Sequence, residues 1–240
     1  MGILSGSHLD ITRIIIYINA GFFLLSLLLS LSHMNLALDP LRFLSPSQEG
    51  LFILGATGTI PISMYGRWWT LISASYLHGG LLHIFFNMLA LSQLGHFVAH
   101  EFGVNRFIVI YTLTGIAGFL LSYLAGIPFT IGASASICGF IGAILYYGKT
   151  RGGFYGYAIY KQATGWVIGL VIFGLLIPGI NNWAHGGGIV SGILLARLLG
   201  YSEQREETML HRTLSAACAF LTVGVLLWVV IQTIYLLILS

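Results

Sequence analysis

Charged residues are scarce in this 240-residue chain, where Lys, Arg, Asp and Glu together make up 7% of the sequence. A soluble domain carries about 25% charged residues on average. The scarcity excludes a soluble globular protein, and a hydrophobic content of 57% predicts an all-α polytopic membrane protein. The formal net charge of +3 comes from scattered residues, so we expect no nucleic acid partner.

Acidic residues are absent from the long apolar segments. The chain has seven, and all lie outside those segments: Asp10, Asp39, Glu49, Glu101, Glu203, Glu206 and Glu207. A Ser-His-Asp triad therefore has no obvious acidic member, and an aspartyl protease has no carboxylate pair. A hydrolase made from this chain would have to use a Ser-His dyad.

Cysteine is limited to Cys138 and Cys218, both in apolar segments, where a free thiol is most often a small buried hydrophobe. Histidine is the other common metal ligand, and His78, His83 and His185 could form a metal site. No carboxylate or cysteine joins them on the predicted outer side. We expect no metal and no cofactor.

Seven apolar segments can be recognised. They are Ile11–Leu31, Leu71–Gly95, Phe107–Ala125, Ser134–Tyr147, Ala163–Ile177, His185–Leu199 and Leu214–Leu239. A simple membrane-spanning helix needs about 20 residues, so the shorter fourth to sixth segments should be surrounded by other helices. The first is too long for the core of a signal peptide and lacks a cleavage site, so we expect it to be retained. Residues 1–240 then form a single membrane domain, in which the apolar loop 32–66 is partly embedded.

Lys and Arg are divided unequally between the two sets of loops. Eight fall on one side, namely Arg13, Arg106, Lys149, Arg151, Lys161, Arg197, Arg205 and Arg212, and two fall on the other, namely Arg42 and Arg67. Cytoplasmic loops carry the excess of positive charge. The N-terminus is therefore predicted in the cytoplasm and the C-terminus outside. No organelle-targeting sequence is evident, which favours a bacterial cytoplasmic membrane.

Ser134 and His185 each begin one of these segments. A hydroxyl and an imidazole are the two groups of an activated serine nucleophile, and polar residues within membrane segments are functional candidates. The predicted orientation places both near the outer face. His83 and Asn87 lie at the same depth and, being four residues apart, share one helical face. They could donate hydrogen bonds to an oxyanion or serve as polar contacts between helices.

Glycines accompany both candidate residues. Gly132 precedes Ser134, and Gly188 and Gly192 share a face of the segment that begins at His185. Small residues let helices approach closely, which could bring the serine to the histidine or could be ordinary tight packing.

Together these residues resemble the rhomboid family of intramembrane serine proteases. The resemblance covers about residues 67–199 and leaves residues 213–240 as one extra C-terminal transmembrane helix. It rests on the following matches: Gly132-Ala133-Ser134, Ala184-His185 with Gly188 and Gly192, and His78 and His83 with Asn87.

The resemblance implies a rhomboid-like helical bundle of seven transmembrane helices, six in the core plus one. It implies Ser134 as nucleophile and His185 as general base. His83, Asn87 and the backbone N–H of Ser134 would form the oxyanion hole, with His78 close to the site. The implied activity is serine endopeptidase cleavage of transmembrane protein substrates in the lipid bilayer, near its outer face.

The chain departs from the family pattern at three positions. Ala135 stands where glycine is frequent, and Cys138 stands where an aromatic ring often stacks on the histidine. Gly66 replaces the tryptophan of a Trp-Arg pair, and Trp68 and Trp69 could compensate for it.

The sequence leaves two other functions open. A rhomboid-like pseudoprotease would bind membrane clients without cleaving them, although such relatives typically lack the serine or the histidine. A transporter or channel is weakened by the lack of a clear inverted repeat and of a buried acidic relay.

Overall fold

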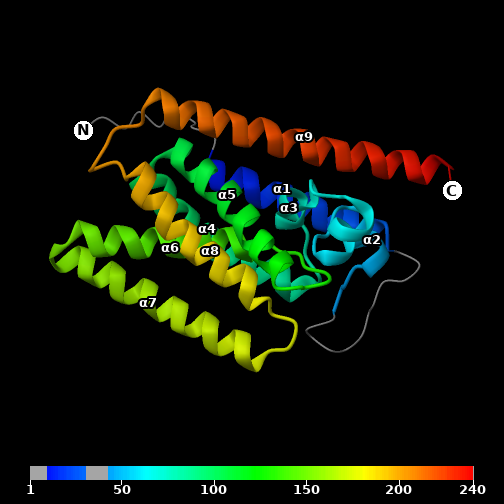
Figure 1. The fold of residues 1–240 in the computed structure, drawn as a ribbon, viewed down its shortest axis with the longest axis horizontal. Helices are drawn as coiled ribbons and strands as arrows, with labels where there is room; N and C mark the ends of the chain where they lie inside the picture. The colour runs from blue at the N-terminus through cyan, green and yellow to red at the C-terminus, as the bar shows by residue number, and fades with distance from the viewer. Residues whose placement is uncertain (1–9, 31–42, 240) are drawn as a thin grey trace.

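The computed structural model describes residues 10–30 and 43–239, and within them the protein is a bundle of helices (Figure 1). The long helices are α1 (Ile11–Leu28), α4 (Leu81–Phe102), α5 (Val104–Leu124), α6 (Ser134–Arg151), α7 (Gly153–Leu176), α8 (Asn182–Leu199) and α9 (Met209–Leu239). Between α1 and α4 lie the short helices α2 (Gln48–Ile53), η1 (Ile60–Met64), α3 (Thr70–Ser73) and η2 (Ala74–Tyr76). Within the described residues, Thr57 pairs with Thr130 in an isolated antiparallel bridge.

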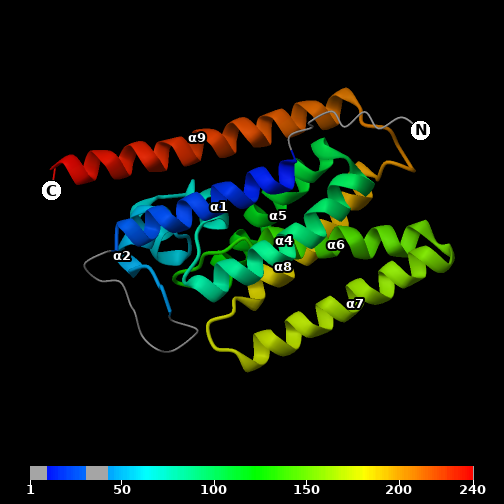
Figure 2. The ribbon, with the colours of Figure 1, turned by 180° about the vertical axis from the view of Figure 1, so that it is seen from behind.

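Five of the long helices, α1, α4, α5, α7 and α9, are long and apolar enough to cross a membrane. The other two, α6 and α8, have 18 residues each, which is shorter than the roughly 20 that a simple span needs. They are covered by neighbours, since α6 packs against α4, α5, α7 and α8 at the centre of the bundle (Figure 1, Figure 2). The protein is an all-α polytopic membrane protein, as its composition predicted. The count of seven spans stays a prediction.

The packing of α6 on α8 depends on glycine. A Cβ added to Gly188 would overlap with the carbonyl oxygen of Ala135, and one added to Gly192 would overlap with the carbonyl oxygen of Gly139. The two backbones are therefore in direct contact, as small residues allow. Because both pairs advance by four residues, α6 and α8 run parallel, and their first turns lie at the same end of the bundle.

The second predicted segment, Leu71–Gly95, is not one helix. Its first residues form α3 and η2, and α4 begins only at Leu81, after Gly79 and Gly80. His78 therefore lies in the turn before α4 and not on the helix. The fifth segment, predicted at Ala163–Ile177, begins earlier as α7, because Lys161 and Gln162 interrupt its apolar sequence. Lys161, counted above as a loop charge, therefore lies within a helix.

The loop after α1 is described at Leu29 and Ser30 and again from Phe43 onward. The predicted end of the first segment at Leu31, together with Asp39 and Arg42, lies outside the described residues. Further along, Leu51 and Leu54 are buried inside the protein. This part of the loop packs on the bundle, and its predicted embedding in the membrane stays a prediction.

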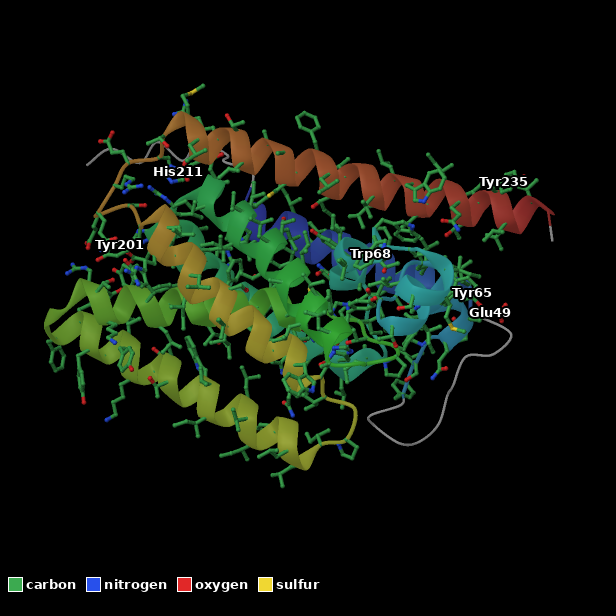
Figure 3. The ribbon with its side chains drawn as sticks, in the orientation of Figure 1. Glu49, Tyr65, Trp68, Tyr201, His211 and Tyr235 are labelled. Carbon is green, nitrogen blue, oxygen red and sulfur yellow. The ribbon has the colours of Figure 1, made fainter. Side chains whose placement is uncertain are left out.

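Positive charge gathers where α1, α5 and α9 begin and where α6 and α8 end. Tyr201 and His211 mark this end in Figure 3, whereas Tyr65 and Trp68 lie at the other. Arg106, counted above as a loop charge, is fully buried in the first turn of α5. It donates hydrogen bonds to the carbonyl oxygens of Phe102, Leu199, Arg205 and Glu206. Its role in the fold is therefore to join α5 to the end of α8 and to the segment that leads into α9.

Candidate active site

Ser134 and His185 meet at the adjoining first turns of α6 and α8. The distance between Oγ of Ser134 and Nε2 of His185 is 2.9 Å, which is within hydrogen-bonding range. Both side chains are only partly buried. On the other side of the ring, Nδ1 of His185 is buried and has no hydrogen-bond partner within the described residues. The two side chains have the geometry of a nucleophile and its base without an acidic third member.

Ser134 is the first residue of α6 and follows a tight backbone turn at Gly132. Gly132 has φ of +124°, a conformation that side chains other than glycine rarely adopt, and its N–H donates to the carbonyl oxygen of Ala74 at 2.9 Å. The helix begins without a side-chain cap from its N-cap residue, Ala133. Its first N–H groups, that of Ser134 among them, point toward a position where the helix dipole favours negative charge.

His83 lies against this tight turn. A Cβ added to Gly132 would be 2.8 Å from Nε2 of His83 and 3.7 Å from Oγ of Ser134. Glycine is thus required at this position if the imidazole is to lie beside the serine. The N–H of Gly79 donates to Nδ1 of His83 at 3.2 Å, so Nε2 is left as the nitrogen that carries a proton.

Asn87 follows His83 by one helical turn and is nearly buried, with 8% of its surface exposed. Its Nδ2 donates to the carbonyl oxygen of His83 at 2.8 Å. This bond uses one of the two amide protons, and the second remains for a bound group. The same bond holds the amide against α4, on the face that carries His83.

His78 is fully buried in the turn before α4. Its ring lies edge-on to that of His83, with the ring centroids 5.0 Å apart. Neither of its nitrogens has a hydrogen-bond partner among residues 10–30 and 43–239. The same residues contain no group of three His, Cys, Asp or Glu side chains that could hold a metal ion. His78 therefore contributes to the site through its contact with the His83 ring.

Cys138, for which the sequence resemblance led us to expect an aromatic residue, is buried next to α8. A Cβ added to Gly188 would be 3.0 Å from its Cβ. The side chain thus fills the space one turn into the α6–α8 contact.

Arg67 is anchored without a tryptophan in front of it. Its guanidinium donates to the carbonyl oxygens of Phe52 at 2.7 Å and Ile53 at 3.1 Å, at the end of α2. The rings of Phe52 and Trp69 lie on it, each with its centroid 4.5 Å from Cζ. Trp69 therefore contributes an aromatic contact to Arg67, and compensation by Trp69 for the absence of a tryptophan at position 66 stays a prediction.

Asn181 was not recognised from the sequence, although it contacts the segments that carry both candidate catalytic residues. Its Oδ1 accepts the N–H of Ala184, and its Nδ2 reaches Ser122 and Thr130. The signal that could have revealed it is an asparagine directly before a helix, which is typical of an N-cap. Such a signal predicts the cap alone and not the two distant partners.

The comparison with known families gives a match to the Rhomboid domain over residues 65–202. Among curated proteins, the chain is 33% identical to the rhomboid protease GluP of Bacillus subtilis over 65% of this chain and 31% of that protein. It is 32% identical to RHOMBOID-like protein 4 of Arabidopsis thaliana over 70% of this chain and 43% of that protein. It is also 32% identical to the Inactive RHOMBOID-like protein 8 of Arabidopsis thaliana, over 73% of this chain and 50% of that protein. The matched region is therefore about a third to a half of the length of these relatives.

Proposed function

The chain belongs to the rhomboid family, and on that premise we propose that it is an intramembrane serine endopeptidase that cleaves transmembrane proteins. The observation that carries the proposal is the 2.9 Å separation between Oγ of Ser134 and Nε2 of His185. A general base must lie within about 2.6–3.2 Å of the proton donor that it serves. The pair meets this requirement before any substrate is bound.

In the proposed reaction, Oγ of Ser134 attacks the scissile carbonyl carbon while its proton passes to Nε2 of His185. The carbonyl electron pair moves to the oxygen and forms a tetrahedral oxyanion. When the oxyanion collapses, the C–N bond breaks and His185 gives the proton to the leaving nitrogen. Water then loses a proton to His185, its oxygen attacks the acyl carbon, and the C–Oγ bond breaks with return of the proton to Ser134.

We assign stabilisation of the oxyanion to three donors. Nε2–H of His83 lies beside Gly132, the N–H of Ser134 belongs to the uncapped start of α6, and Asn87 retains one free amide proton. Donors fixed in advance act on charge that develops in the transition state.

We infer that the site opens near the outer face of the membrane. The first two turns of α4 and the first turns of α6 and α8 carry the candidate residues, and the opposite ends of α6 and α8 carry Lys149, Arg151 and Arg197. Because cytoplasmic ends hold the excess of Lys and Arg, the turns that bear the site would be the outer ones. The N-terminus would then be cytoplasmic, and the substrates would be transmembrane proteins cut near their outer ends.

Labelling with a fluorophosphonate probe tests the proposal in detergent or liposomes. We expect the probe to modify Ser134, and to modify neither Ser134→Ala nor His185→Ala. A folded wild-type protein that takes up no probe would contradict a protease and favour a rhomboid-like protein that binds membrane clients without cleaving them.

A further inference from the structure

The side chain of Asn181 uses both ends of its amide. Its Oδ1 accepts the N–H of Ala184 at 3.1 Å and so caps α8. Its Nδ2 donates to Oγ of Ser122 at 2.6 Å and to Oγ1 of Thr130 at 2.9 Å. Its backbone carbonyl oxygen accepts the N–H of His185 at 3.1 Å. The residue that starts the helix of His185 is thus bonded to two other parts of the chain.

The two partners lie near the two ends of the connection from α5 to α6, which leads to Ser134. Ser122 is buried in the last turn of α5. Thr130 is four residues before Ser134, and its backbone exchanges hydrogen bonds of 2.7 and 3.0 Å with Thr57. The segment that leads into Ser134 is therefore held on one side by the loop after α1 and on the other by Asn181.

The glycine contacts between α6 and α8 fix how closely these helices approach, but the segment before α6 lies beyond those contacts. Asn181 bonds to that segment and to the first turn of α8 at once. A shift of about 1 Å between reacting groups can cost about 10²-fold in rate. A bond at this point thus bears directly on the distance between Oγ of Ser134 and Nε2 of His185.

We propose that Asn181 is a positioning residue that aligns His185 with Ser134 by tying the start of α8 to the segment before α6. This inference rests on the proposed function. Within the described residues, the side-chain hydrogen bonds of Asn181 go to Ser122, Thr130 and Ala184. Asn181 therefore acts on the catalytic pair through Thr130 and Ser122 on one side and through the capped first turn of α8 on the other.

The variant Asn181→Ser separates the two roles of the side chain. Serine still caps a helix, since its hydroxyl can accept from the first turn, but it is too short to reach Ser122 and Thr130. We expect kcat for a single-span substrate and the rate of fluorophosphonate labelling to fall at least tenfold. We expect KM and the melting temperature to stay close to the wild-type values.

Asn182→Ser is the matched control. Asn182 is the neighbouring residue of the same type, and its Nδ2 donates to the carbonyl oxygen of Gly174 in α7 at 2.8 Å. It ties α8 to a different helix, so its labelling rate should stay within about twofold of the wild type. Thr130→Val should slow labelling. It should cause no further loss in the Asn181→Ser background, because the hydrogen bond that it removes is already absent there.

The outcomes are distinguishable. If the wild type labels and Asn181→Ser labels at the same rate, the positioning role is wrong and the proposed function stands. If the wild type does not label at all, the proposed function fails and this inference fails with it. Should Asn181→Ser melt well below the wild type, the double variant Ser122→Ala with Thr130→Val leaves the cap in place. Unchanged labelling by that double variant overturns the inference.

Discussion

The backbone N–H of Gly79 donates a hydrogen bond to Nδ1 of His83 across 3.2 Å. A neutral imidazole that accepts at one nitrogen carries its proton on the other. The turn that ends before Leu81 therefore sets the tautomer of His83 and directs a donor, Nε2–H, toward Gly132 and the start of α6. The ring of His78 also packs against the His83 ring, with the ring centroids 5.0 Å apart.

Replacing His83 with Ala should lower kcat by about 10²–10³, the typical effect of losing one oxyanion donor. Asn87→Ala should have a smaller effect, because one of its amide protons already bonds to its own helix. KM should change little in either variant, since the charge appears only in the transition state. Steady-state kinetics on a cleavable single-span substrate measures both constants. His100→Ala is the control, because His100 is exposed on the same helix, and loss of substrate binding with unchanged kcat in His83→Ala would refute the assignment.

Ser134→Ala should abolish cleavage, whereas Ser136→Ala should retain it. The two serines are neighbours on α6, but the hydroxyl of Ser136 is fully buried and lies against Gly115 of α5. It has no hydrogen-bond partner among the described residues, whereas Oγ of Ser134 lies 2.9 Å from Nε2 of His185. Product analysis by mass spectrometry decides between them. Cleavage by Ser134→Ala with none by Ser136→Ala would exchange the two roles.

The long helices could be predicted from the sequence to within a few residues at α1, α5, α6 and α8, because each is a continuous apolar segment that ends at glycines or polar residues. The start of α4 could not, since Leu71 and Ile72 are as apolar inside a short helix as inside a span. Only the contacts of α3 and η2 with the rest of the bundle separate the two cases.

The candidate site was predictable where residue chemistry carries the signal, as for Ser134, His185 and His83. It was not predictable where long-range contacts carry it. Asn181 binds groups 51 and 59 residues away, and Arg67 binds carbonyl oxygens 14 and 15 residues away. No local pattern specifies such partners.

Arg67→Lys should destabilise the protein by about 1–3 kcal/mol. The guanidinium donates to two carbonyl oxygens at once and contacts two aromatic rings, and a lysine ammonium reproduces neither the fork nor the stacking. Chemical unfolding in detergent, followed by tryptophan fluorescence, measures the change. Arg13→Lys is the control, because Arg13 is 70% exposed in a surface ion pair that is worth little. Equal stability of the two variants would show that the Arg67 contacts contribute nothing.

Activity should fall as the pH is lowered through the titration of His185. Nε2 accepts the proton of Ser134 only when it is unprotonated. The loss on the acid side should follow a single protonation and should reverse when the pH is restored. The rate of fluorophosphonate labelling against pH tests this without a substrate. Labelling that becomes faster in acid, in a sample that stays folded, would be incompatible with His185 as base.

The orientation of the chain in the membrane can be tested at two small exposed residues that lie in connections at opposite ends of the bundle. Ala125 follows α5 on the side of the candidate site, and Ser202 follows α8 on the side of the positive charges. With Cys138 and Cys218 replaced by Ala, an impermeant maleimide on intact cells should label Ala125→Cys and should spare Ser202→Cys. Lysing the cells should make both react, which controls for accessibility. The physical basis is that Lys149, Arg151, Arg197, Arg205 and Arg212 gather at the end where Ser202 lies, and positive charge is retained in the cytoplasm. Labelling of Ser202→Cys alone in intact cells would invert the topology and place Ser134 near the cytoplasmic face.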